Sequence, residues 1–140
     1  MDKERNIICG IDPGVNTGFA VFNIKTKELE LYTLKIHQAF DKIRELKSRI
    51  KSVTIEDPNL WTHFKDQKQA AAKLQGAGSV KRDFSAWKDF LSDESIEMKT
   101  CRPDKHRNAI AYNTDLFERV TNFSGRCSEH ARVAAMLVHN

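Results

Sequence analysis

The strongest constraint on the fold of this chain is an apolar segment near its start that ends in a carboxylate. The sequence IICGID ends at Asp12 and precedes a Pro-Gly pair, and a second apolar segment, TGFAVF, follows. This order predicts a β-hairpin with strands at 6–12 and 17–24. An Asp at the end of a buried strand, with Pro and Gly after it, lies where a divalent cation or a phosphate can approach. The alternative interpretation is an Asp that only opens a turn.

Size and charge set broad limits on what the chain can be. Its 140 residues are 40% hydrophobic, which suits a single domain over 1–140 with a packed core. There are 23 Lys and Arg against 19 Asp and Glu, so the net charge is +4. This excess suits an anionic partner such as nucleic acid without requiring one.

The cysteines and the apolar segments indicate the cellular compartment. Cys9, Cys101 and Cys127 are odd in number and widely spaced, with no metal-finger pattern, as expected of free thiols in a reducing compartment. The first residues lack an apolar signal core, and no apolar segment approaches the ~20 residues of a membrane span. We therefore expect a cytoplasmic protein with no membrane partner.

The remaining pattern predicts an α/β fold. After the hairpin we expect a third strand and then alternating helices and strands. The predicted elements are a strand at 28–35, a helix at 37–50, a strand at 52–57, a long helical region at 66–92, a strand at 95–101 and helices at 113–121 and 127–138. Three consecutive strands followed by a returning parallel strand describe a mixed five-stranded sheet flanked by helices.

Two of the predicted strands end in carboxylates at the same edge of that sheet. The strand at 52–57 carries Glu56 near its end, and it can insert beside the first strand, which ends at Asp12. Two carboxylates brought this close repel each other unless a cation lies between them. Hard oxygen ligands favour Mg²⁺ or Mn²⁺. The sequence therefore predicts a metal site built on Asp12 and Glu56.

Four short segments follow one another in an informative order. They are GIDPG at 10–14 with Thr17-Gly18, Ile55-Glu56, KLQGAG at 73–78 and SEHAR at 128–132. Together they resemble RuvC-type Holliday junction resolvases, especially the short phage and prophage branch, over essentially the whole chain. The resemblance implies a ribonuclease H-like fold, a homodimer, and metal-dependent hydrolysis of phosphodiesters in four-way DNA junctions, in recombination, repair or phage DNA processing.

The first of these segments is less specific by itself, because sugar kinases and actin-like ATPases begin with a similar hairpin. Those proteins need a second domain and a Gly-rich adenosine-binding motif, for which 140 residues leave no room. We therefore expect no nucleotide cofactor.

The resemblance assigns site residues one by one. Asp12 and Glu56 match two acidic ligands of the family in type, and the first of the two ligands on its last helix falls on His130. The second falls on Val133, which cannot ligate a metal. Three interpretations stay open: Glu129 supplies the missing carboxylate, His130 and water alone hold the second metal, or the chain binds junctions with weak or no cleavage.

A complete site of this family implies two Mg²⁺ ions per active site, with Mn²⁺ able to substitute. Asp12 then bridges both ions, Glu56 holds the ion that generates the nucleophile, and His130 supports the other ion or orients the water. In the basic loop expected after the fifth strand, Lys105 is the candidate for stabilising the pentavalent phosphate, with Arg126 as the alternative.

Basic and small residues are predicted to hold the DNA backbone. They are Lys73, Gly76, Gly78, Lys81, Arg82 and Arg126. The two glycines have an alternative role, since they also permit tight packing of two helices.

The homodimer interface is predicted in the long helical region at 66–92, because symmetric cuts across a junction need two sites related by a two-fold axis. Its predicted apolar residues are Leu74, Phe84, Trp87, Phe90 and Leu91.

Overall fold

Five strands and several short helices make up residues 4–58 and 81–139, which are the parts of the chain that the computed structural model describes. The strands are β1 (Ile7–Asp12), β2 (Thr17–Asn23), β3 (Leu29–Leu34), β4 (Ile50–Glu56) and β5 (Met98–Cys101). The helices are α1 (Ile36–Leu46), the short 3₁₀ helix η1 (Lys47–Arg49), α3 (Lys105–Tyr112), α4 (Thr114–Thr121) and α5 (Glu129–Met136), and residues 81–93 are also helical.

The strands form one mixed sheet in the order β3-β2-β1-β4-β5. β2 is antiparallel to β1 and β3, whereas β4 is parallel to β1 and β5. The register places Asp12 opposite Gly18 on β2, and Ile11 opposite Ile55 on β4. Because β1 and β4 are parallel, Asp12 and Glu56 lie at the same edge of the sheet. The predicted mixed five-stranded sheet flanked by helices is confirmed.

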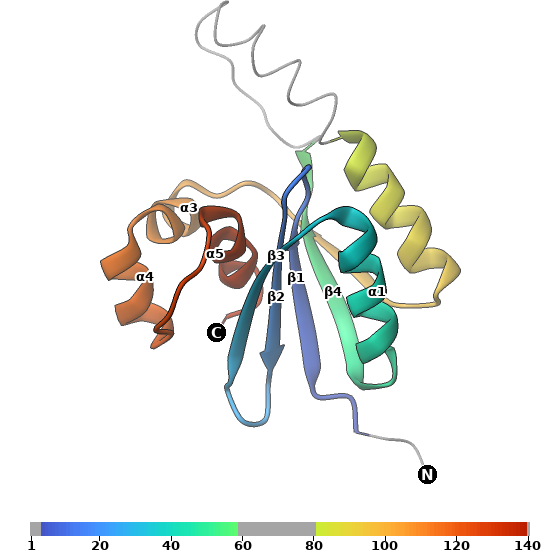
Figure 1. Ribbon diagram of the computed structural model, residues 1–140, viewed down its shortest axis with the longest axis horizontal. Coiled ribbons are helices and arrows are strands. Elements are labelled where there is room, and N and C mark those ends of the chain that lie inside the picture. Colours follow the sequence, from blue (N-terminus) through green and yellow to red (C-terminus); the bar gives the residue numbers. More distant parts are fainter. Residues whose placement is uncertain (1–3, 59–80, 140) are drawn as a thin grey trace, which may run out of the picture.

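Helices cover both faces of this sheet, as Figure 1 shows. α1 and the helical segment 81–93 lie on one face, where Ile43 and Trp87 belong to one apolar cluster. α3, α4 and α5 lie on the other, where Phe22 and Phe117 belong to a second cluster. Because helices cover both faces of the sheet, the carboxyl ends of the strands remain open. The polar side chains Asp12 of β1 and Glu56 of β4 lie there. None of the helices in the described ranges is both long and apolar enough to cross a membrane.

The predicted dimer interface is wrong for four of its apolar residues. They are Phe84, Trp87, Phe90 and Leu91, each at most 8% exposed. All four lie in the cluster that this chain forms between α1 and the sheet, and the Phe90 ring stacks on Phe40 at a centroid distance of 4.1 Å. The apolar stripe of a helix predicts that one face is buried, but it does not show whether that face packs on a partner chain or on the chain's own sheet. The fifth residue, Leu74, lies outside the described residues.

The helix predicted at 37–50 is too long at its C-terminal end. α1 ends at Leu46, η1 follows, and Ile50 already pairs with Ile7 of β1. The apolar spacing that predicted the helix includes Ile50. This residue is buried in the observed strand, and a buried apolar residue at this position suits a helix equally well.

The basic segment after β5 is a helix, not the predicted loop. Asp104 caps α3 by accepting hydrogen bonds from the backbone N–H groups of His106 and Arg107. Asn113 then both ends α3 and caps α4 by accepting the backbone N–H of Leu116. Two side-chain caps separated by one eight-residue helix therefore shape this part of the chain.

Candidate active site

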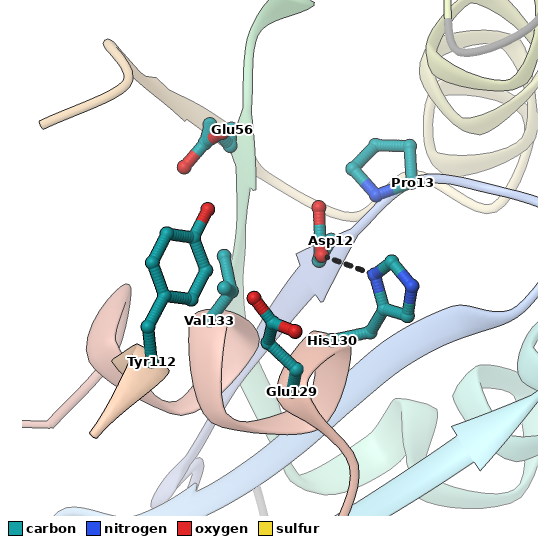
Figure 2. Close-up of a pocket in the computed structure, with 7 residues that line it drawn as sticks. All are labelled: Asp12, Pro13, Glu56, Tyr112, Glu129, His130 and Val133. Atoms are coloured by element: carbon teal, nitrogen blue, oxygen red, sulfur yellow. Dashed lines mark hydrogen bonds and ion pairs between the residues drawn. The ribbon is translucent and has the colours of Figure 1, made fainter. Parts of the chain in front are cut away.

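A pocket of about 260 Å³ opens at the carboxyl ends of β1 and β4 (Figure 2). The residues that line it are Asp12, Pro13, Glu56, Tyr112, Glu129, His130 and Val133. The structure thus brings together four of the predicted site residues from three elements, β1, β4 and α5. Among them is Glu129, which lines the pocket with His130 although consecutive helix residues differ in direction by ~100°.

Asp12 and His130 form the closest polar contact in this pocket. Nδ1 of His130 donates a hydrogen bond to Oδ2 of Asp12 at 3.0 Å. This hydrogen bond is the main cause of a raised pKa at His130; partial burial opposes the increase, and the Asp12 and Glu129 charges add to it. His130 is therefore paired with Asp12 in this structure.

Two glycines allow α5 to approach the sheet closely enough for this contact. A Cβ atom at Gly18 would lie 2.0 Å from the carbonyl oxygen of His130, and one at Gly10 would lie 2.1 Å from that of Ala134. Real Cβ atoms do not come this close to other atoms, so only glycine fits at either position. The start of α5 is set by Ser128, whose hydroxyl accepts the backbone N–H of Ala131.

Arg107 places a positive charge beside Glu56. Its Nη2 is 3.7 Å from Oε2 of Glu56, and the two side chains are only 20% and 9% exposed. The same Nη2 donates a hydrogen bond to the carbonyl oxygen of Arg102. Lys105, the predicted phosphate-stabilising residue, begins the same helix but is exposed and does not line the pocket. Helix phase brings Arg107 rather than Lys105 to Glu56, although Arg107 is not a lining residue either. The alternative candidate Arg126 is exposed and outside the pocket lining.

Tyr112 is a pocket residue that the sequence analysis missed. It is the last residue of α3 and is 57% exposed, and its hydroxyl end faces the side of the pocket where Glu56 lies (Figure 2). Burial of the hydroxyl raises its pKa, and the carboxylates of Glu129, Glu56 and Asp12 raise it further. The phenol is therefore a hydrogen-bond donor. No motif in the sequence surrounds this tyrosine, so only its position at the end of α3 in the structure connects it with the pocket.

Arg132 fixes the end of α3 against α5 and thereby fixes Tyr112. Its Nε donates to the carbonyl oxygen of Ala111 at 2.6 Å, and its Nη1 donates to that of Cys127 at 3.1 Å. The first contact satisfies a carbonyl of the last helical turn, which has no partner within the helix.

Val133 lies in the wall of the pocket, one helical turn after His130. It is 5% exposed but belongs to neither apolar cluster of the described residues. Its methyl groups thus occupy the place on α5 from which a second metal ligand of this helix would project.

The pocket offers three carboxylates, which are donors that a hard divalent cation prefers, and one imidazole. Within the described residues, no three His, Cys, Asp or Glu side chains come close enough together to hold a metal ion as they stand. Asp12 is instead paired with His130, and Glu56 with Arg107. The donor chemistry fits a cation, which would compete with His130 for Asp12 and share Glu56 with Arg107.

The predicted DNA-binding residues lie mostly beyond the pocket. Lys81 and Arg82 are exposed at the start of the helical segment 81–93, and Arg126 is exposed in the loop before α5. Lys73, Gly76 and Gly78 lie outside the described residues. Their role in holding DNA stays a prediction.

Comparison with solved structures identifies the fold. RuvC of T. thermophilus in complex with Holliday junction substrate is similar with a TM-score of 0.60 and 14% sequence identity, over 94% of this chain and 89% of that chain. The fold is that of RuvC, the ribonuclease H-like fold. A second Thermus thermophilus RuvC structure gives a TM-score of 0.53 and 15% identity, over 94% of this chain and 90% of that one. No protein-family model and no curated protein matches the sequence.

Proposed function

We propose that this chain is a metal-dependent endonuclease that resolves four-way DNA junctions. The observation that supports this most directly is the pocket in which Asp12, Glu56, Glu129 and His130 meet at the carboxyl ends of two parallel strands. The pocket belongs to a fold that this chain shares with a RuvC protein whose structure was solved with Holliday junction substrate. Fold alone does not define an activity, so the proposal depends on the chemistry of these residues.

Each residue in the pocket has a role in this proposal. A divalent cation would supply Lewis acidity for phosphodiester hydrolysis. Asp12 and Glu56 would hold the cation through carboxylate oxygens, with Glu129 or His130 as a further donor. Tyr112, which keeps its proton because its pKa is raised, can donate a hydrogen bond to a phosphate oxygen.

A junction-binding protein with weak or no cleavage is the second candidate. Val133 supports it, because a hydrophobic side chain lines the pocket where the resemblance predicts an acidic ligand. The exposed cations at Lys81, Arg82 and Arg126 would serve either function, since phosphate contacts require no catalysis.

A cleavage assay separates these two functions. A synthetic four-way junction and an intact duplex of the same sequence are incubated with the protein and Mg²⁺, and binding to each is measured in parallel. Cutting of the junction but not the duplex supports the nuclease. Tight junction binding without cutting at any Mg²⁺ or Mn²⁺ concentration supports the second candidate.

Val133→Asp tests whether the pocket lacks a ligand. We expect the new carboxylate, one helical turn after His130, to reach the pocket and increase cleavage, with the largest gain at low Mg²⁺. A carboxylate buried there without a cation would destabilise the fold by about 1–3 kcal/mol. The measurements are the Mg²⁺ dependence of junction cleavage and the thermal stability with and without Mg²⁺.

Glu129→Gln is the companion variant for that experiment. Increased cutting by Val133→Asp together with little effect of Glu129→Gln supports a lost ligand. Loss of stability in the first variant and of all cleavage in the second would show instead that Glu129 already completes the site.

We also propose that the active form is a homodimer, because paired cuts need two active sites related by a two-fold axis. The buried apolar residues of the segment 81–93 cannot form its interface. Analytical ultracentrifugation at micromolar concentration is expected to show a dimer. A monomer that still makes paired cuts would contradict this proposal.

A further inference from the structure

The charges that the described residues place around the pocket do not balance two divalent cations. Asp12, Glu56 and Glu129 line the pocket with three carboxylates, and the Arg107 guanidinium lies 3.7 Å from Glu56. Three negative charges and one positive charge leave two negative charges, which one divalent cation neutralises. A second cation would leave an excess of two positive charges.

Arg107 is held in this place by its surroundings. Its Nη2 also donates to the carbonyl oxygen of Arg102, and its backbone N–H is bound by the Asp104 cap that starts α3. The side chain is 20% exposed, so solvent screens its charge less than that of a surface arginine. A cation that approached Glu56 from this side would meet the guanidinium at close range.

Val133 removes a ligand for a second cation. Its side chain lines the same pocket and offers no lone pair. The pocket therefore has no ligand at this position of α5 and has one guanidinium beside Glu56, and both features disfavour a second divalent cation.

We infer that this pocket takes one divalent cation rather than two, and that the Arg107 guanidinium supplies the second positive charge beside Glu56. The inference rests on the proposed metal site and differs from the two-ion site that the sequence resemblance implies. It requires no movement of α3, because Arg107 already lies against Glu56.

The number of bound Mn²⁺ ions tests this inference without any cleavage. Electron paramagnetic resonance counts the ions bound by the full chain, alone and with an intact four-way junction. The ions lost in Asp12→Asn are those of the pocket, since surface sites are unchanged by that substitution. We expect one such ion per chain; two ions would overturn the inference.

Substitutions at Arg107 test whether its guanidinium limits the number of divalent cations that the pocket binds. Arg107→Gln removes the repelling charge, so Mn²⁺ should bind about tenfold more tightly, whereas Arg107→Lys should bind within about twofold of the wild type. The double variant Arg107→Gln with Val133→Asp should bind two pocket ions. Unchanged affinity in Arg107→Gln, with thermal unfolding like that of the wild type, would overturn the role of Arg107.

The outcome also separates this inference from the proposed function. One Asp12-dependent ion with no junction cutting would support the inference and contradict the nuclease. No Asp12-dependent ion in any condition would overturn both the inference and the metal site.

Discussion

Asp12→Asn will abolish junction cleavage, lowering the single-turnover rate by about 100-fold or more, while junction affinity stays within a few-fold of the wild type. The substitution removes the charge that β1 presents to the pocket but changes the shape of the side chain very little. Glu56→Gln should behave in the same way, because its carboxylate ends the neighbouring strand at the same edge. The rate is measured at saturating Mg²⁺, and the affinity by gel shift in the absence of cleavage.

Asp41→Asn is the matched control for this experiment. Asp41 is an exposed carboxylate on α1, on the opposite face of the sheet, and pairs only weakly with Arg44 at 3.3 Å. Its neutralisation changes the net charge by the same amount as Asp12→Asn. Cleavage by Asp12→Asn at the rate of this control would place the active site elsewhere in the chain.

Gly18→Ala is expected to displace the first turn of α5 and to separate His130 from Asp12. The new Cβ would lie 2.0 Å from the carbonyl oxygen of His130 and 2.3 Å from its carbonyl carbon. These are backbone atoms, so no side-chain rotation relieves the clash and the helix itself must move. We expect a loss of about 3 kcal/mol or more in the free energy of unfolding, and a loss of cleavage at temperatures where the variant is still folded.

Two other glycines provide the controls. Gly14→Ala lies in the same hairpin, where the nearest atom to the new Cβ is 3.6 Å away, so its stability should stay within about 1 kcal/mol of the wild type. Gly10→Ala meets Ala134 at 2.1 Å and should destabilise the fold like Gly18→Ala, but farther from His130. Equal cleavage rates in the folded Gly18→Ala and Gly10→Ala variants would show that the position of α5 at His130 does not affect catalysis.

Local sequence patterns were sufficient to predict the sheet and its carboxylates. Apolar segments that end in Asp12 and Glu56 predicted two strand ends, and the observed parallel pairing of β1 and β4 places both at one edge. The prediction succeeded because strand alternation and turn residues act over a few neighbours, and the rules of chain connection leave few ways to arrange such strands.

Short helices with side-chain caps were harder to predict. α3 has eight residues and lacks a continuous apolar stripe, so its cap at Asp104 was the main local signal. Because α3 was not predicted, the sequence analysis named Lys105 and not Arg107. The turn of the helix distinguishes them, since it directs Arg107 to Glu56 and leaves Lys105 exposed.

The sequence by itself predicted a metal site on Asp12 and Glu56, and its resemblance to a known family added His130 and Glu129 and marked Val133 as a departure from the family pattern. Only the tertiary structure decided that Tyr112 lines the same pocket, that Arg107 lies beside Glu56, and that the apolar side of the segment 81–93 packs on this chain's own sheet. The physical reason is that strand and helix patterns encode which face of an element is buried, whereas the partner of that face depends on contacts between residues far apart in the chain.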